Sequence, residues 1–374
     1  MKALVLSGGG AHGAYEAGVA KALLAREDFD VICGVSIGAI NAALIAAGND
    51  GALEHFWYRE FPAHALRLFP HVPRLRRLIG HLGAIGQGNP WKDAMSVART
   101  ASALPFLRNL GNVHKTSLPV VADALAAMVD FKQLRKSLLV GATNASRASA
   151  VVFRASAGTN RLSVHRHPLT EYHDLTDENF VLALLASSAM PGLFSPIELT
   201  FGEESALYAD GCLVHTSPLG LAIDNGATEV TVVFVDQELD SQTTDAAHNL
   251  PQMAYNIATL WQQRFLEYEV RLAAATNEVV RLGGAPGKRQ ISIRYVRPSR
   301  PLELDMLAFD DQSALVDAFE RGLIDGAAPP RIKLPEAAPE RAPVPAIAVA
   351  ANDGERFWDS MRRIFARPSL KRTG

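Results

Sequence analysis

A serine between two closely spaced glycines is the first feature of this sequence that could do chemistry. The stretch Gly34-Val35-Ser36-Ile37-Gly38 has the spacing Gly-x-Ser-x-Gly, which is typical of a nucleophile placed on a sharp strand-to-helix turn. The two glycines let the chain turn tightly without a clash at Cβ. A helix that begins directly after Ser36 would direct free N–H groups toward a developing negative charge. The pattern therefore predicts a nucleophilic serine.

A serine hydroxyl is a poor nucleophile until a base accepts its proton. Asp210 follows a short strand predicted for residues 206–209 and precedes Gly211, so its carboxylate can point toward a site at the edge of a sheet. His215 could complete a Ser–His–Asp triad, although an ordinary loop histidine is the simpler interpretation. In α/β-hydrolases the nucleophile elbow follows several strands. Here only two predicted strands lead to Ser36, which argues against that fold.

The glycine-rich stretch "LSGGGAHGAYEAGV" near the start of the chain has two interpretations. Gly8, Gly10 and Gly13 have the spacing of a dinucleotide-binding turn, but their backbone N–H groups could equally bind the oxyanion of an acyl-transfer reaction. A dinucleotide site needs an acidic residue at the end of the second strand. Residues 33–36, Cys-Gly-Val-Ser, occupy that place, and no Gly-Lys-Ser/Thr follows the glycines. We favour the oxyanion interpretation and keep a nucleotide-binding protein as the alternative from another class.

The elements that must position these residues alternate between strand and helix. Two strand–loop–helix units within the first fifty residues predict an α/β fold with a parallel sheet and helices on both faces. The strands are expected at residues 3–6, 29–33, 137–142, 150–154, 206–209, 229–235 and 291–296. Helices are expected at residues 14–25, 37–47 and 249–277, with a last one within 306–327. Residues 51–135 are expected to be mainly helical and irregular.

Composition excludes several classes of protein. The chain has 374 residues with 48% hydrophobic and 20% charged content, as expected for a globular protein. The formal net charge of −2 favours no nucleic-acid partner. No signal peptide and no spanning apolar run is apparent, so we expect a cytoplasmic location. The histidines of "HRH" at 165–167 and His173 lack metal-ligand spacing and are interpreted as a solvated loop, so no metal site or cofactor is expected.

Four motifs together resemble the patatin-like phospholipases and lipid acyl hydrolases. In the order of that family they are "GGGAHG" after the first strand, "GVSIGA" after the second, "ASSAMPGLFSP" at 186–196 and "ADGCLVHTSPL" at 209–219. Weaker similarities are "VGATNASRA" at 140–148 and "VRPSRPLELDMLAFD" at 296–310. The resemblance covers about residues 1–326. It implies a three-layer α/β/α fold with a mainly parallel central sheet and a helical cap insertion.

The resemblance also implies roles for individual residues. Ser36 is then the nucleophile and Asp210 the base of a Ser–Asp dyad that uses no histidine. The oxyanion hole and the glycines that support the elbow and dyad are expected at these positions: Gly8, Gly9, Gly10, His12 and Gly13; Gly34, Gly38 and Gly211. The implied activity is hydrolysis of carboxylic esters in lipids or phospholipids. Acyl transfer to an acceptor other than water uses the same dyad and stays an alternative.

Two positions depart from the family pattern. The family usually has Arg or Lys where this chain has His12, and a histidine changes its charge near neutral pH, so weaker or more pH-sensitive activity is expected. Cys212 stands where the family has Gly or Ala after Asp-Gly and could crowd the site. Cys33 and Cys212 could lie near each other, but we favour two ordinary buried thiols over a redox pair.

The expected domain organisation has three parts. Residues 1–328 form the patatin-like domain, with 51–135 as cap or insertion; 329–350 form a Pro/Ala-rich linker; 351–374 form a basic amphipathic tail. Residues 61–92 contain arginines and apolar residues but no acidic residue. This composition suits either a lid that contacts anionic lipid headgroups or a helical insertion with a solvated basic face. Transient peripheral contact with the inner face of a membrane is therefore an open expectation, and the oligomeric state is not predicted.

Overall fold

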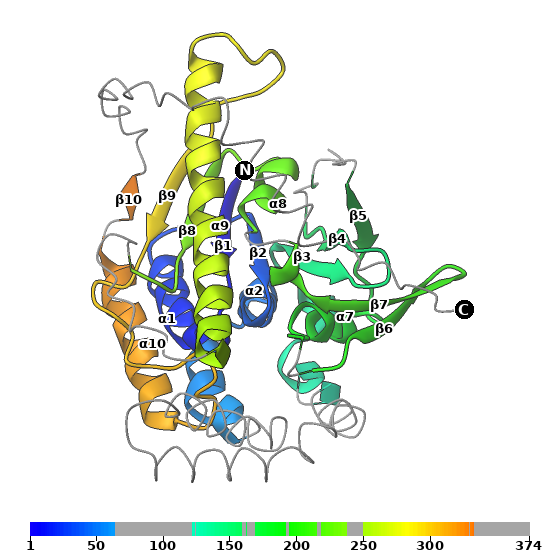
Figure 1. Ribbon diagram of the computed structural model, residues 1–374, viewed down its shortest axis with the longest axis vertical. Helices are drawn as coiled ribbons and strands as arrows, with labels where there is room; N and C mark the ends of the chain where they lie inside the picture. The colour runs from blue at the N-terminus through cyan, green and yellow to red at the C-terminus, as the bar shows by residue number, and fades with distance from the viewer. Residues whose placement is uncertain are drawn as a thin grey trace, which may run out of the picture. The chain divides into compact units, whose positions relative to one another are not determined.

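The computed structural model describes residues 1–63, 122–123, 125–158, 162, 169–191, 194–214, 218–237, 250–328 and 330–332, with backbone alone at 250–264 and 331–332 (Figure 1). The chain divides into a compact unit, residues 1–334, and a second unit, residues 335–374. Most of the expected cap and lid, the expected linker after residue 332 and the C-terminal tail lie outside the described residues. His215 and the "HRH" segment lie outside them as well.

A mainly parallel sheet forms the centre of the first unit. Its described strands follow the order β10-β9-β8-β1-β2-β3-β4-β5, with β7 paired to β3 and β6 paired to β7. The strands β8, β9, β1, β2 and β3 pair in parallel, whereas β4 and β7 run antiparallel to β3. The bounds are β1 Lys2–Leu6, β2 Val31–Val35, β3 Ser137–Asn144, β4 Ser149–Ala155, β5 Thr170–Asp174, β6 Ile197–Phe201, β7 Glu204–Asp210, β8 Glu229–Val233, β9 Ser292–Val296 and β10 Arg331–Ile332.

Helices cover both faces of this sheet. Alternate residues of β1 enter two separate cores: Leu4 and Leu6 pack on one face, and Ala3 and Val5 pack on the other, as the two-residue repeat of a strand requires. The first core contains residues of α1, α2, α7 and α10, and the second contains residues of α8 and α9. The bounds are α1 Gly13–Leu24, α2 Ile37–Ala46, α3 Ala52–His55, α7 Phe180–Ser187, α8 Leu219–Asp224, α9 Leu250–Arg281 and α10 Gln312–Ala327. Figure 1 shows α9 crossing the sheet on the side opposite α1. The predicted three-layer α/β/α fold is confirmed.

Close packing of α10 against α1 holds the first helix in place. A Cβ added to Gly18 of α1 would lie 2.1 Å from the carbonyl oxygen of Phe319, and one added to Gly322 of α10 would lie 2.1 Å from that of Tyr15. Since real Cβ atoms do not approach so closely, only glycine lets the two backbones come this near. The helix that follows the glycine-rich loop is therefore fixed by a helix three hundred residues further along the chain.

Sequence patterns located most elements within a few residues, but five were not predicted. The run that forms α7 is apolar throughout and too short to show a helical period. The β5 strand, Thr-Glu-Tyr-His-Asp, is polar and lies at an edge of the sheet. In addition, α8 and β6 were not recognised. Arg331 and Ile332, expected in an extended linker, pair antiparallel with β9.

The interpretation of His173 as part of a solvated loop is wrong. His173 lies in β5, and its ring stacks on Phe201 with 3.9 Å between ring centroids. The pairing of β5 with β4 brings the ring beside Phe153 and Tyr208 as well. Its role is therefore to pack in an aromatic cluster.

Within the described part of the chain, no helix combines the length and the apolar character needed to cross a bilayer.

Candidate active site

Ser36 occupies the turn between β2 and α2 that its flanking glycines predict. Its backbone has φ 57° and ψ −135°, a conformation that is rare for residues other than glycine and that clusters at functional sites. A Cβ at Gly34 would lie 2.3 Å from the carbonyl oxygen of Gly38, and one at Gly38 would lie 2.7 Å from that of Leu6. The elbow is possible because both positions are glycine.

Asp210 contacts the Ser36 hydroxyl directly. Ser36 Oγ donates to Asp210 Oδ2 at 2.8 Å, although the two residues are 174 positions apart in sequence. Ser36 is 5% exposed and Asp210 is 2% exposed. Asp210 ends β7, whose pairing with β3 brings it beside the strand next to the elbow. The backbone can pass there because Gly211 has no side chain, since its Cβ would lie 2.3 Å from the carbonyl oxygen of Gly141.

Burial tunes the acidity of Asp210. Loss of solvation raises its pKa to about 6, and hydrogen bonds from the Cys212 N–H and the Ser36 hydroxyl oppose that rise. The Cys212 N–H donates to Oδ1 at 2.9 Å, so both carboxylate oxygens accept hydrogen bonds. A carboxyl group with a pKa close to neutrality can both accept and return a proton near pH 7.

The glycine-rich loop lies against the elbow. Gly8, Gly9 and Gly10 have positive φ values of 76°, 127° and 60°. A Cβ at Gly8 would lie 2.5 Å from the carbonyl oxygen of Val35, and one at Gly10 would lie 2.3 Å from that of Met306. The loop is therefore enclosed by the end of β2 and by the segment that precedes α10.

Three of the N–H groups expected in an oxyanion hole already have protein acceptors. The N–H of Gly8 donates to Glu16 Oε1 at 3.0 Å. The N–H of His12 donates to the carbonyl oxygen of Gly9 at 3.2 Å, and the N–H of Gly13 donates within the same 3₁₀ turn. These groups hold the loop in shape, so binding an oxyanion would cost them those bonds.

Gly9 and Gly10 retain N–H groups to which no described residue serves as acceptor. Two adjacent backbone donors beside a nucleophile are the usual composition of an oxyanion hole. Two of the five expected positions therefore keep a backbone N–H group that no described residue accepts. The His12 ring instead bonds through Nε2 to the carbonyl oxygen of Leu304 at 2.7 Å. A carbonyl only accepts, so Nε2 carries the hydrogen and the ring ties the loop to residue 304.

A buried network of polar side chains is hydrogen-bonded to the glycine-rich loop. Sequence reasoning did not identify it. Glu16 of α1 is fully buried, and loss of solvation raises its pKa to about 7 against hydrogen bonds from Gly8, Asn41 and Ser7. Asn41 Nδ2 donates to Glu16 Oε2 at 3.2 Å, and Asn41 Oδ1 accepts from Trp57 Nε1 at 3.0 Å. The available signal was the single acidic residue of α1, which lies among Gly, Ala and Tyr in the first turns of that helix.

Ser187 is a second residue that the pattern did not identify individually. Its hydroxyl oxygen accepts the N–H of Ser36 at 3.0 Å and its hydrogen goes to the carbonyl oxygen of Gly141 at 2.7 Å. Ser187 ends α7 within the motif at 186–196. It therefore links the strained nucleophile residue to β3.

The two cysteines are free thiols. Cys33 is fully buried in the core between the sheet and α8 and α9, and burial raises its pKa well above the usual value. Burial, followed by the charge of Asp210, raises the pKa of Cys212. Neither thiol has the lowered pKa of a reactive thiolate. Cys212 fits beside Asp210 and donates its N–H to it.

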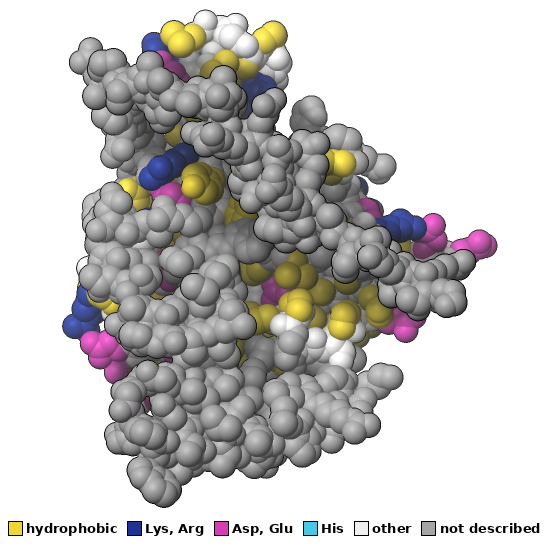
Figure 2. Space-filling view, viewed as in Figure 1, with side chains coloured by type: hydrophobic (Ala, Val, Ile, Leu, Met, Phe, Trp, Pro, Cys, Tyr) yellow, Lys and Arg dark blue, Asp and Glu magenta, His cyan; other side chains and the backbone are white. Residues whose placement is uncertain are grey.

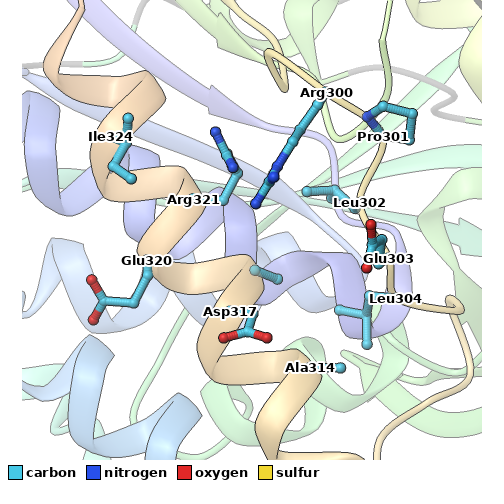
Figure 3. A pocket seen from close by; sticks show the side chains of 11 residues that line it. Arg300, Pro301, Leu302, Glu303, Leu304, Ala314, Asp317, Glu320, Arg321 and Ile324 are labelled. Atoms are coloured by element: carbon cyan, nitrogen blue, oxygen red, sulfur yellow. The ribbon is translucent and has the colours of Figure 1, made fainter.

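A pocket of about 330 Å³ lies between residues 300–304 and α10 (Figure 3). Figure 3 shows the Arg300 and Arg321 side chains converging while Glu320 points away from them. Glu303 and Asp317 add negative charge to the lining, so the pocket has no single-sign field that would select an ion. It contains neither Ser36 nor Asp210.

Among the described residues, no cluster of three or more His, Cys, Asp or Glu side chains is arranged to hold a metal ion.

Comparison with known proteins identifies the family. The family profile described as patatin-like phospholipase matches residues 4–223, more than half of the chain. No curated protein sequence matches. Two solved structures are similar. VipD from Legionella pneumophila is 16% identical with a TM-score of 0.33, covering 87% of this chain and 66% of its own. The type III effector protein ExoU is 15% identical with a TM-score of 0.24, covering 90% and 55%. This chain therefore spans less than two thirds of either protein. The profile match, which includes the loop, the elbow and Asp210, shows that the chain belongs to the patatin-like phospholipase family.

Proposed function

We propose that this chain is a serine lipid acyl hydrolase that uses Ser36 as nucleophile, Asp210 as general base and the Gly9 and Gly10 N–H groups as oxyanion hole. Membership of the family implies hydrolysis of lipid esters. The observation that carries the residue assignment is the 2.8 Å hydrogen bond from Ser36 Oγ to a buried carboxylate, made by a serine in a strained elbow beside a loop with two open N–H groups.

The first half-reaction forms an acyl-enzyme. Ser36 Oγ attacks the ester carbonyl carbon while its proton passes to Asp210 Oδ2. The negative charge that develops on the carbonyl oxygen is bound by the N–H groups of Gly9 and Gly10, and one such donor contributes about 3–4 kcal/mol. When the tetrahedral intermediate collapses, the ester C–O bond breaks and Asp210 returns the proton to the leaving alcohol.

The second half-reaction releases the fatty acid. Water attacks the acyl-Ser36 carbonyl, its proton goes to Asp210, and the same two N–H groups bind the oxyanion. Collapse breaks the Ser36–acyl bond and Asp210 returns the proton to Ser36 Oγ. A pKa near 6 for Asp210 supports both directions of proton transfer, because neither protonation state is strongly favoured near neutral pH.

Apolar surface next to the dyad supports a lipid substrate. Leu213 and Val214 follow Asp210 closely and are 53% and 41% exposed. Figure 2 shows hydrophobic side chains gathered around a hollow in the region of α2, α7 and β7, with an acidic side chain within it. Exposed aliphatic groups beside a nucleophile favour an acyl chain over a polar substrate. Contact of the basic, apolar residues 61–92 with a membrane surface stays a prediction.

The buried Glu16 argues against the nucleotide-binding alternative. Its carboxylate already accepts the N–H of Gly8, the kind of group that binds phosphate in a dinucleotide site. A phosphate placed on this loop would meet a carboxylate at hydrogen-bond distance from the backbone it needs. Ser36, and no acidic residue, directly follows the second strand.

The direct test labels the protein with a fluorophosphonate probe and measures hydrolysis of short-chain esters. Wild type is expected to be labelled and active, and Ser36→Ala to lose labelling and nearly all turnover. Activity retained by Ser36→Ala would contradict the assignment. Retained activity of Asp210→Asn together with its loss in His215→Ala would instead indicate a conventional triad. Adding a lysolipid or alcohol acceptor and measuring product partition would separate hydrolysis from acyl transfer.

A further inference from the structure

The outer face of α9 carries an apolar stripe that the proposed function does not use. Tyr268, Leu272 and Val279 are 59%, 68% and 46% exposed, and Leu282, the residue directly after α9, is 69% exposed. The exposed Ala275 completes the series. The spacing alternates between four and three residues, which is the a/d repeat of a coiled coil. On a helix with 3.6 residues per turn these positions fall within an arc of about 80°.

The stripe lies opposite the face by which α9 packs on the sheet. Leu266 and Val270 are buried in the core between α9 and the sheet, and Ala274 is buried on the same side of the helix. Glu267 pairs with Arg297, whose guanidinium stacks 3.6 Å from the centroid of Phe234. The helix is thus anchored on its inner side, and the apolar stripe faces outward from a fixed support. Single exposed apolar residues are common, but a heptad series is typical of helix pairing.

We propose that α9 is a self-association surface that pairs antiparallel with α9 of a second copy of this chain. The stripe is complementary to itself in that arrangement. When the twofold axis passes between residues 273 and 274, Leu272 faces Ala275 of the other copy and Tyr268 faces Val279. Each layer then combines a larger side chain with a smaller one, which is what interdigitated packing requires.

The charges beside the stripe select the antiparallel arrangement. Arg271 and Glu278 both occupy the g position on one side of the series. In an antiparallel pair the g residues of the two helices face each other, so Arg271 of one copy meets Glu278 of the other, and the symmetry repeats that pair. The two side chains bond within their own helix in the monomer, Arg271 to Glu267 and Glu278 to Arg281, and both are accessible at the surface. A parallel pair would not bring them together.

The contact from Tyr268 to Leu282 is about 21 Å long at 1.5 Å per residue. This length gives an interface at the small end of specific protein contacts. We therefore expect a dimer that dissociates on dilution.

The test follows the mass of the full-length protein over a concentration series by sedimentation velocity or light scattering. Wild type is expected to change from monomer to dimer. Leu272→Glu is expected to weaken the dimer by about tenfold or more, since it buries a charge in the central layer. The matched control is Ile324→Glu, which changes an equally exposed aliphatic residue, 62% exposed, on α10. It is expected to leave dimerisation unchanged.

Charge exchange tests the register. Arg271→Glu and Glu278→Arg are each expected to weaken the dimer by about tenfold, because each places like charges face to face twice. The double variant restores the pairs and is expected to recover the affinity.

Cysteine cross-linking tests the same register independently. A copy with Tyr268→Cys should form a disulfide with a copy carrying Val279→Cys more readily than either copy does with itself.

Three results would overturn the proposal: a chain that stays monomeric at every concentration, a dimer that Leu272→Glu does not weaken, or failure of the double charge variant to recover. Loss of vesicle binding by a monomeric Leu272→Glu protein would assign the stripe to a membrane surface instead.

Discussion

In the proposed mechanism the nucleophile side of the site depends on two side chains, Ser36 and Asp210, whereas the oxyanion side depends on the backbone N–H groups of Gly9 and Gly10. Each side nevertheless has a buried carboxylate with a raised pKa: Asp210, to about 6, and Glu16, to about 7. Asp210 accepts the hydroxyl that we propose as the nucleophile, while Glu16 accepts a backbone N–H of the glycine-rich loop. The comparison teaches that the same buried group can serve chemistry or support, according to the donor that faces it.

Asp210→Asn is expected to cause the largest loss of activity, because it removes the proposed general base. The amide keeps the shape and can still bond to Ser36, but it cannot accept a proton. We expect kcat for a soluble ester to fall by about 10³–10⁴-fold while fluorophosphonate labelling slows in parallel.

The same variant is expected to be more stable than wild type at neutral pH. The folded-state pKa of Asp210, about 6, lies above the ordinary value of 3.8 for this side chain, so the native state binds the extra proton and wild-type stability falls as pH rises through about 4 to 6. Asparagine removes this loss of about 1–3 kcal/mol. Thermal melts of both proteins at pH 4 and pH 8 measure it. A variant that is no more stable at pH 8 would contradict the assigned shift.

A methyl group added at Gly10 is expected to disrupt the proposed oxyanion hole. Gly10→Ala places a Cβ 2.3 Å from the carbonyl oxygen of Met306 at a φ of 60°, so the loop must move and the N–H groups lose their alignment. We expect kcat to fall by about 10²–10³-fold with a smaller change in KM. Gly202→Ala is the matched control, because φ is 64° there and nothing lies within 4 Å of the added Cβ. Equal loss of activity in the two variants would mean that backbone strain alone is responsible.

Glu16→Gln tests whether Glu16 only holds the glycine-rich loop in place or also takes part in proton transfer. Glu16 accepts from donors at both oxygens, Gly8 N–H and Asn41 Nδ2, so the glutamine NH₂ must face one of them. We expect a loss of about 1–3 kcal/mol in stability and a decrease of about tenfold in kcat. The pH at which activity rises should not move, because Glu16 takes no proton from the substrate. A shift of that pH would instead assign Glu16 a part in proton transfer.

A change of pH, with no change of sequence, is expected to have the smallest effect on activity. Asp210 works as a base only when ionised, so kcat/KM should rise with pH and level off above about pH 6, falling by about tenfold per pH unit below it.

The local patterns around Ser36 and Gly8 predicted the elbow, the loop and the first β–α–β–α segment correctly. These features depend on residues adjacent in sequence, because a strand, a turn and a helix are specified by short-range sterics and periodicity. The short elements β5, α7 and α8 were not predicted, since their signal comes from pairing and burial in the finished sheet.

The sequence by itself determined the α/β order, the strained serine turn and a set of candidate groups that included Asp210. Only the tertiary structure decided that Asp210, 174 residues away, accepts a hydrogen bond from Ser36. It also decided that Glu16 accepts the N–H of Gly8, whereas no described residue accepts the N–H groups of Gly9 and Gly10. The physical reason is that a hydrogen bond joins two partners. Which donors remain for a substrate depends on every acceptor that the fold brings near, and sequence spacing does not contain that information.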